Sequence, residues 1–371
     1  MSQVAPVQSA KRILSLDVLR GLIMLLLAAE SCMLYYNLEQ ASLPSPVNAV
    51  VMQFFHHPWH GLRFWDLVQP AFMTMAGAAL YISYHYKRNA GVSWSQNLPH
   101  ILKRCARLLA LGVALHCIYA GRLVWELWNV LAQLAVTTVI AYLIIRRSPL
   151  FQVIFSIALL VLTELLYRNV HVDEFTQPFT WGKNFGSWMD TILMGKINTD
   201  GWVAFNFIPT AAHTIWGVLA GRLLVSAIGY REKLKYLVVA AAACLMAGYL
   251  LDWLHVTPII KRICTSSFVL VSGGWVLLMI AALYLITDVW KRQKYAWIFV
   301  VMGMNAIFIY MFFETVGHQW LNPTVLIFVK GILSFASVGE QAILIASSLV
   351  TLLIEWWICY WLYKKKIFFK L

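Results

Sequence analysis

Charged side chains are scarce in this sequence of 371 residues. Asp, Glu, Lys and Arg make up 12% of it, about half the share found in an ordinary soluble domain, whereas hydrophobic residues make up 61%. Apolar runs of roughly 18–25 residues, separated by short polar stretches, are long enough to cross a hydrocarbon core of about 30 Å as helices. The composition therefore excludes an ordinary soluble domain and predicts an all-α, polytopic membrane protein.

Cysteine pairs of the kind that hold metals or build disulfide frameworks are also missing. The six cysteines are scattered and form no CxxC pair. Three histidines do stand close together, at positions 56, 57 and 60. Neighbouring side chains point apart, however, and no further ligand set accompanies them, so we expect no metal.

The chain lacks a Pro-, Gly- or Ser-rich linker, a low-complexity segment and a convincing internal repeat. We therefore expect a single transmembrane domain over residues 1–371. Although the formal net charge is +13, no basic groove on a soluble face is evident, so we expect no nucleic-acid partner.

About ten membrane-spanning helices are expected from the apolar runs. They lie near residues 16–36, 64–84, 99–119, 125–145, 149–167, 204–226, 235–254, 267–287, 296–316 and 341–363. A shorter apolar run, Val325–Phe335, is interrupted by Lys330 and Gly331 and predicts an interfacial or re-entrant piece.

Lysines and arginines indicate the orientation, because they are enriched in cytoplasmic segments. If the N-terminus is inside, most of the 29 basic residues fall in inside segments. This bias predicts that both termini are cytoplasmic, that 37–63 and 168–202 face outward, and that the lipid bilayer is the main partner. The loop between the seventh and eighth spans is the exception, since Lys261 and Arg262 face outward.

Several ionisable residues stand inside the expected spans, where each costs a few kcal/mol unless it faces a cavity or a partner. Glu30, His213 and Glu314 lie far from the span ends. They indicate a polar interior, either an enzyme cleft or a transport path.

The stretch "FFHHPWHGLRFWDLVQPAF", residues 54–72, leads into the second span. A histidine can take a proton from an amine or hydroxyl, and a partly buried carboxylate can orient and stabilise it. His56 and Asp66 are candidates for this pair, and Trp59 and Trp65 suit the walls of a sugar or acyl site. The alternative is an aromatic belt at the membrane surface that happens to contain histidines.

The longest polar interval, 168–202, is rich in Trp, Gly, Asn and Asp. Aromatic faces beside amides and carboxylates suit a sugar. A membrane-interface loop with belt tryptophans is the simpler interpretation of the same residues.

Several motifs together resemble the heparan-α-glucosaminide N-acetyltransferase family and its bacterial relatives. They are "SLDVLRG" (15–21), "HHPWHGLRFWDLVQPAF" (56–72), "WMDTIL" (188–193), "IPTAAHTIWGVLAGRLL" (208–224), "KRICTSSFVLVSGGW" (261–275) and "GMNAIFIY" (303–310). One difference from the family lies late in the first span. Many members have Asn there, whereas this chain has Glu30 and Ser31. The stretch from Cys32 to Phe55 is also longer than in many relatives.

The resemblance implies an enzyme of the bacterial cytoplasmic (inner) membrane. It would carry acetyl from cytosolic acetyl-CoA, as co-substrate, to the amine of a glucosamine-type sugar or glycan on the far side. His56 takes the place of the family's catalytic histidine, as base or as transient acetyl carrier, and Asp66 that of its carboxylate. Trp59, Asp190 and Lys261 are expected to bind the acceptor.

Four further residues are expected to contact the coenzyme. Arg20 suits the phosphates, with a pair to Asp17 as the alternative. Thr265, Ser266 and Asn305 suit the thioester or pantetheine, with helix–helix hydrogen bonds as the alternative. A homodimer is included among the expected partners.

Two other functions use the same features. An amino-sugar transporter or permease would also need a polar cleft, but no broken helices in matching halves are visible in the sequence. An O-acyltransferase of an envelope polysaccharide would share the chemistry and differ in the acceptor.

Overall fold

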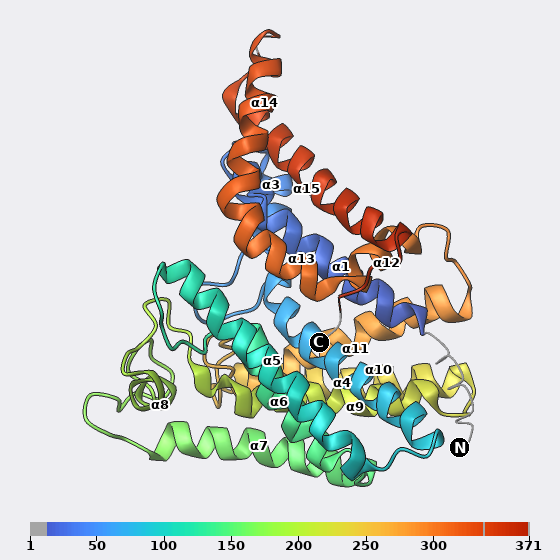
Figure 1. Cartoon of the computed structure of the whole chain (residues 1–371). Coiled ribbons are helices and arrows are strands. Elements are labelled where there is room, and N and C mark those ends of the chain that lie inside the picture. Colours follow the sequence, from blue (N-terminus) through green and yellow to red (C-terminus); the bar gives the residue numbers. More distant parts are fainter. Residues whose placement is uncertain (1–12, 337, 370–371) are drawn as a thin grey trace.

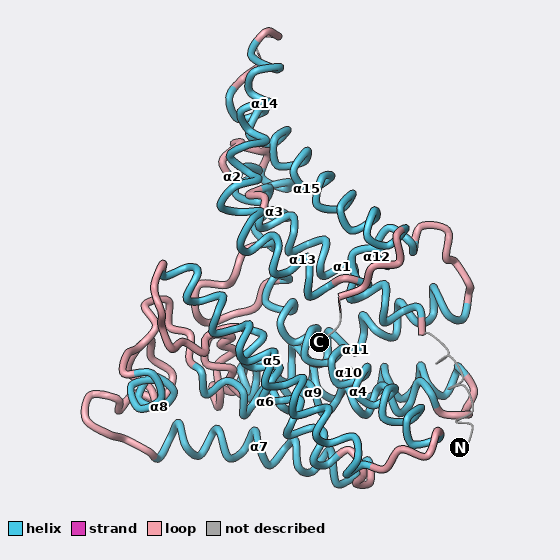
Figure 2. Tube along the Cα trace, viewed as in Figure 1, coloured by secondary structure: helices cyan, strands magenta, loops and turns pink. Residues whose placement is uncertain are grey.

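The computed structural model describes residues 13–336 and 338–369 and is helical throughout its regular elements (Figure 1 and Figure 2). Within these residues no strand is present, which agrees with the predicted all-α class. Three basic residues that enter the topology prediction, Lys11, Arg12 and Lys370, lie outside the described residues.

The longer helices in chain order are α1 (Leu14–Ser31), α4 (Val68–Asn89), α5 (Trp94–Ala120), α6 (Val130–Ile144), α7 (Pro149–Asn169), α9 (Phe207–Val225), α10 (Tyr230–Trp253), α11 (Ser266–Leu283), α12 (Ala296–Met304), α14 (Asn322–Ser334) and α15 (Glu340–Lys364). Shorter α-helices are α2 (Leu34–Glu39), α3 (Ser45–Val51), α8 (Phe185–Met194) and α13 (Ala306–Phe312). The 3₁₀-helices are η1 (Met52–Phe54), η2 (Phe64–Leu67) and η3 (Ala204–Asn206), and the π-helices are η4 (Tyr284–Val289) and η5 (Phe313–Leu321).

Local sequence explains where several helices begin. Ser93 caps α5, because its hydroxyl accepts a hydrogen bond from Gln96 N at 3.2 Å while the Gln96 side chain accepts one from Ser93 N at 2.8 Å. Ser148 caps α7 through its hydroxyl, which accepts from Phe151 N at 3.2 Å, and Pro149 occupies the first position of the helix. Such caps satisfy backbone N–H groups that the helix itself leaves free.

Each expected span coincides with a helix or helix pair, but the ninth is bent. Among the described residues, five helices are long and apolar enough to cross a membrane: Pro149–Asn169, Ala204–Val225, Tyr230–Trp253, Ser266–Val289 and Glu340–Lys364. The ninth predicted span breaks at Asn305, where α12 and the helix that continues from Ala306 to Ser334 meet at 74°. Counted as one span, this pair makes a sixth. The structure therefore shows a multi-pass membrane protein.

The bend at Asn305 also sets the direction of the helix that contains the short apolar run at 325–335. This run forms α14, the end of the helix that starts at Ala306, and α14 packs against the beginning of α15. In Figure 1 the α14–α15 hairpin projects away from the rest of the molecule.

Small residues let α4 and α9 approach closely near the middle of the molecule. A Cβ added to Gly77 would lie 1.9 Å from Thr214 O, and one added to Gly217 would lie 2.0 Å from Thr74 O. Side chains larger than glycine would therefore separate the two backbones. This contact holds α4, and with it the loop before α4, against the centre of the bundle.

Two loops that are distant in sequence meet at one end of these helices. Gly61 N donates to Ile259 O at 2.8 Å, and His60 and Ile260 form an isolated antiparallel bridge. Gly61 has φ +141, and an added Cβ would lie 2.5 Å from the His57 ring. Only glycine fits this close approach. The loop before α4 is thereby fixed against the loop before α11.

Candidate active site

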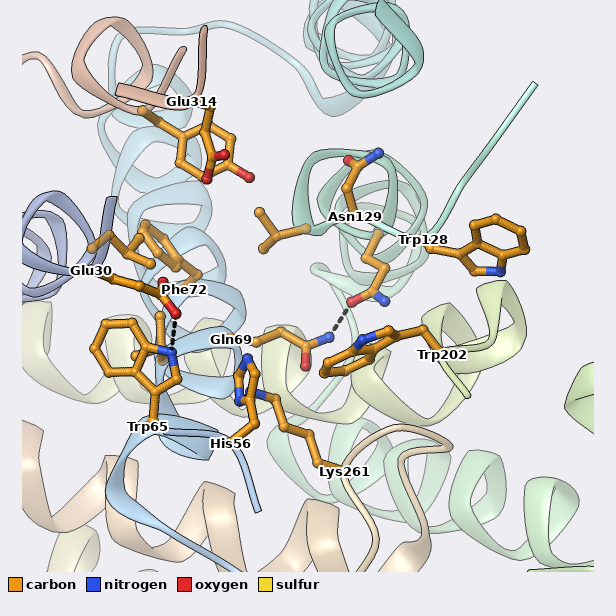
Figure 3. A pocket seen from close by; sticks show the side chains of 15 residues that line it. Glu30, His56, Trp65, Gln69, Phe72, Trp128, Asn129, Trp202, Lys261 and Glu314 are labelled. Carbon is orange, nitrogen blue, oxygen red and sulfur yellow. Dashed lines mark hydrogen bonds between the residues drawn. The ribbon is translucent and has the colours of Figure 1, made fainter. Parts of the chain in front are cut away.

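A cavity of about 170 Å³ opens where these two loops meet α1, α4, α6 and η5 (Figure 3). Its polar side chains come from every part of the chain: Glu30, His56, Gln69, Asn129, Gln133, Lys261 and Glu314. Apolar and aromatic residues, among them Trp65, Trp128 and Trp202, complete the walls. Convergent polar groups in a mostly apolar pocket are typical of a ligand site.

His56 and Asp66 form a hydrogen-bonded pair at the edge of this cavity. His56 Nδ1 lies 3.0 Å from Asp66 Oδ1. The Asp66 side chain is fully buried, and its second oxygen accepts from Arg63 N at 2.9 Å and from His57 N at 3.2 Å. A carboxylate held by backbone donors is a rigid acceptor for Nδ1–H. When Nδ1–H donates to Asp66, the lone pair is on Nε2 at the opposite edge of the ring, and the His56 side chain lines the cavity.

Lys261 brings a third charged group to this pair from a loop almost two hundred residues later. Its Nζ lies 3.0 Å from His56 Nδ1 and 3.5 Å from Asp66 Oδ1, and only 5% of the residue is exposed. Burial lowers the pKa of Lys261 from its usual value, whereas the charge of Asp66 acts in the opposite direction. A buried charge of this kind needs such a partner.

His56 is neutral near pH 7 in this environment. Burial, followed by the charge of Lys261, lowers the pKa of His56 to about 4, although the bond to Asp66 works against the shift. A neutral imidazole can accept a proton at Nε2, whereas an imidazolium cannot. The ring is therefore in the form that can accept a proton, as a general base must be before the reaction.

Aromatic side chains enclose the His56 side of the cavity. The His56 and Trp202 rings meet edge to face, with centroids 5.5 Å apart. Trp128 is held by Asp190, because its Nε1 donates to Asp190 Oδ2 at 2.6 Å, and Ala204 N donates to Asp190 Oδ1 at 2.9 Å. Burial raises the pKa of Asp190 to about 7. Asp190 thus positions a wall of the cavity and does not itself line it.

Two carboxyl groups line the part of the cavity formed by α1 and η5. Glu30 accepts from Trp65 Nε1 at 2.9 Å, and Glu314 accepts from the Tyr119 hydroxyl. Figure 3 shows both side chains on the α1 and η5 side, apart from Lys261. This side of the cavity therefore offers acceptor oxygens to a cation or to hydroxyl groups.

The three clustered histidines have different surroundings. His57 contributes its backbone N–H to Asp66, and its ring lies against Gly61. His60 Nε2 lies 2.7 Å from Asp252 Oδ1, and its side chain is 53% exposed. Of the three, only His56 lines the cavity.

Seven of the nine expected site residues do not line the cavity, although one of them, Asp66, holds His56 at its edge. Besides Asp190, Trp59 stacks on Trp181 with centroids 5.3 Å apart, and its Nε1 donates to Phe179 O. Arg20 pairs with Asp17. These are local contacts within the loops and along α1.

Thr265, Ser266 and Asn305 also have structural partners. Thr265 Oγ1 donates to Pro258 O at 2.7 Å, and Ser266 Oγ donates to Leu160 O at 3.2 Å. Asn305 Nδ2 donates to Ile367 O at 3.0 Å, and Asn305 Oδ1 accepts from Phe369 N at 2.9 Å. Contacts of these three residues with a coenzyme stay predictions.

Several cavity residues were not singled out from the sequence. Gln69 and Gln133, which hydrogen-bond to each other, are the main case, together with Trp128 and Trp202. The two glutamines were detectable as amides within apolar spans, since amides there need a polar partner. No local feature distinguishes Trp128 or Trp202 from tryptophans of a membrane belt.

Comparison with known proteins relates this site to one family. A comparison with curated proteins found no significant match. A family model described as heparan-alpha-glucosaminide N-acetyltransferase, catalytic, matches residues 12–248. The match includes His56, Asp66 and Asp190, whereas Lys261 and Asn305 lie beyond it. Because the matched residues make up more than half of the chain, this membrane protein belongs to the heparan-α-glucosaminide N-acetyltransferase family, as its motifs predict.

Proposed function

We propose that the protein is an acetyltransferase that moves acetyl from cytosolic acetyl-CoA to the amine of a glucosamine-type sugar at the extracytoplasmic side. The observation that carries this proposal is the His56–Asp66 pair, with Nδ1 and Oδ1 3.0 Å apart and the His56 side chain lining the cavity. Membership of an N-acetyltransferase family supports the same chemistry.

His56 acts as the general base. When bound, acetyl-CoA supplies an activated acetyl thioester. As the amine nitrogen bonds to the acetyl carbon and the C–S bond breaks, the proton of the amine passes to His56 Nε2 and then to the departing sulfur. Asp66 holds Nδ1–H and stabilises the imidazolium that forms.

Burial and the charge of Lys261 together keep His56 unprotonated before the reaction. The ammonium group of Lys261, 3.0 Å from Nδ1, disfavours a second positive charge on the ring. Lys261 also lines the cavity, where it can hydrogen-bond an acceptor hydroxyl or the carbonyl oxygen of the acetyl group.

The carboxyl groups of Glu30 and Glu314 favour a basic acceptor. They line the cavity together with His56, so an ammonium group that enters finds two acceptors before it loses its proton. The cavity is smaller than the roughly 300–1,000 Å³ of pockets that enclose whole drug-sized ligands. We infer that only the reacting ends of the two substrates enter it, with Trp59 contacting more distant parts of the acceptor.

The remaining assignments complete the proposal. Residues 1–371 form one transmembrane acyltransferase domain with about ten spans and both termini in the cytoplasm of a bacterium, in its inner membrane. The distribution of lysines and arginines supports this orientation. Coenzyme contacts of Arg20, Thr265, Ser266 and Asn305, and a homodimer, remain predictions.

Purified protein, supplied with acetyl-CoA and a panel of amino sugars, tests the reaction. Free thiol should appear only with acceptors that carry a primary amine, and mass spectrometry should find the N-acetyl product. Thiol release with N-acetylated sugars or neutral glycans instead would indicate O-acetylation. Uptake of unmodified amino sugar into proteoliposomes, with no thiol release, would replace the proposal with a transporter.

A further inference from the structure

A second cavity, of about 570 Å³, lies between the end of η4 and the start of α12, beside the first turns of α1. Its walls include the apolar side chains Val18, Leu283, Ile286 and Phe299. Its rim carries Lys291, Arg292 and Lys294. Both cavities contact α1: Leu27 lines the first and Val18 lines the second. These residues are nine positions apart, which is about 14 Å along the helix.

The three cations on the rim have no acidic partner. Among the residues that the structure describes, no carboxylate oxygen lies within 4.0 Å of their side-chain nitrogens. Asp288 precedes them in sequence but accepts from Leu14 N and Ser15 N, at 3.2 and 2.9 Å. It therefore anchors the start of α1. The rim keeps an uncompensated positive charge that attracts an anion.

The backbone of this segment forms a defined turn over the cavity. After the π-helical residues of η4, Lys291 adopts a left-handed conformation with φ 57, and Arg292 N donates to Ile286 O at 3.0 Å. Arg292 lies over the Trp290 ring and Lys294 over the Tyr295 ring, at 5.6 and 5.1 Å. These contacts keep the cations close to the cavity entrance.

Exposed aromatic residues place this entrance at the membrane surface. Trp290, Tyr295 and Trp297 are 56%, 63% and 48% exposed. In a membrane protein, exposed Trp and Tyr gather at the level of the lipid headgroups. The cations thus lie at headgroup level, next to the apolar walls of a cavity.

We propose that this cavity binds the phosphate group of an anionic phospholipid. The phosphate contacts Lys291, Arg292 and Lys294, and the upper part of an acyl chain lies against Leu283, Ile286 and Phe299. Basic pockets between membrane helices have this combination of charge and apolar surface. The positive-inside rule accounts for basic residues in this loop but not for an apolar cavity beneath them.

Lipid binding to the full-length protein in neutral detergent tests this site. The probes are short-chain phosphatidylglycerol and phosphatidylcholine with the same chains, and the readout is the apparent Kd from thermal shift or native mass spectrometry. We expect selective binding of phosphatidylglycerol. Each cation is worth about a fivefold change in affinity, so K291Q/R292Q/K294Q should weaken binding about 100-fold. Arg292→Gln alone should weaken it about fivefold, a useful second variant if the triple variant unfolds.

The matched control removes three lysines elsewhere, in K364Q/K365Q/K366Q, which should retain binding within about threefold. Equal losses in the two triple variants would overturn the proposal, because only general charge attraction would then operate. Adenosine 3′,5′-bisphosphate, the nucleotide part of coenzyme A, is the third probe. If the rim variant loses this nucleotide and keeps phosphatidylglycerol, the cavity is a nucleotide site and the lipid proposal fails.

Discussion

Charged groups are buried and paired near one end of α1 and exposed near the other. Near Glu30, ionisable side chains converge on one cavity, and Lys261 and Asp66 are almost fully buried. Near Val18, the basic residues of the loop before α12 are exposed and unpaired with acids. Burying a charge costs several kcal/mol before its partners compensate, so it persists only where partners are close. The first end therefore suits the proposed proton transfer, and the second suits the proposed attraction of external anions.

Of the changes that test this comparison, removing the imidazole of His56 should lower activity most. His56→Ala is expected to lower kcat by about 10²-fold or more, the usual scale for a lost acid–base group. His57→Ala and His60→Ala, measured at matched expression by thiol release, should stay within a few-fold of the unmodified protein. If either of these is inactive while His56→Ala is active, the assignment of the base is wrong.

Removing the charge of Lys261 should change the pH dependence. Burial, followed by the charge of Lys261, lowers the pKa of His56 to about 4, so its neutral form prevails above that pH. In Lys261→Gln the pKa should rise, and kcat at pH 5 should fall about tenfold, with a much smaller change at pH 8. The unmodified protein and Lys261→Gln are measured with the same acceptor, so that ionisation of its amine affects both pH profiles equally. Parallel pH profiles would exclude this role for Lys261.

Asp190 should affect stability more than chemistry. Because its pKa is raised to about 7 by burial, the folded protein holds a proton between about pH 4 and 7 that the unfolded chain has released. Stability from this group therefore falls as pH rises toward 8. Asp190→Asn should make Tm less dependent on pH between 5 and 8, by a few degrees. An unchanged dependence would mean that Asp190 is already ionised at pH 5.

Arg20 should have the smallest effect. Its partly exposed pair with Asp17 is worth about 0–1 kcal/mol, so Arg20→Gln should barely change Tm. If Asp17 is the main contact of Arg20, the KM for acetyl-CoA should change less than threefold. A rise of tenfold or more would assign Arg20 to the coenzyme phosphates, as its motif suggests.

Polar residues inside apolar helices predicted the site unevenly, since Glu30 and Glu314 line the cavity whereas His213 does not. Asn305 and Thr265 look like ligand-binding groups in sequence, yet Asn305 bonds the backbone of the C-terminal segment at the α12–α13 bend, and Thr265 bonds the loop before α11. Gln69 and Gln133 belong to no motif that indicates a site, yet both line the cavity. An amide or hydroxyl in a membrane helix must find a partner, but its own sequence does not say which one.

Local patterns were enough for most helix positions, though not for the bend at Asn305, and for the hydrogen-bonded pair of His56 and Asp66. Apolar run length and caps such as Ser93 and Ser148 act within a few residues, so helix positions follow from sequence. The His56–Asp66 pair spans ten residues of one loop, which is also short range. Tertiary structure alone decided that Lys261 joins this pair and that Glu30 and Glu314 line the same cavity. Those contacts depend on how closely distant helices pack, as α4 and α9 do at their glycines, and packing distances are not encoded in any single segment.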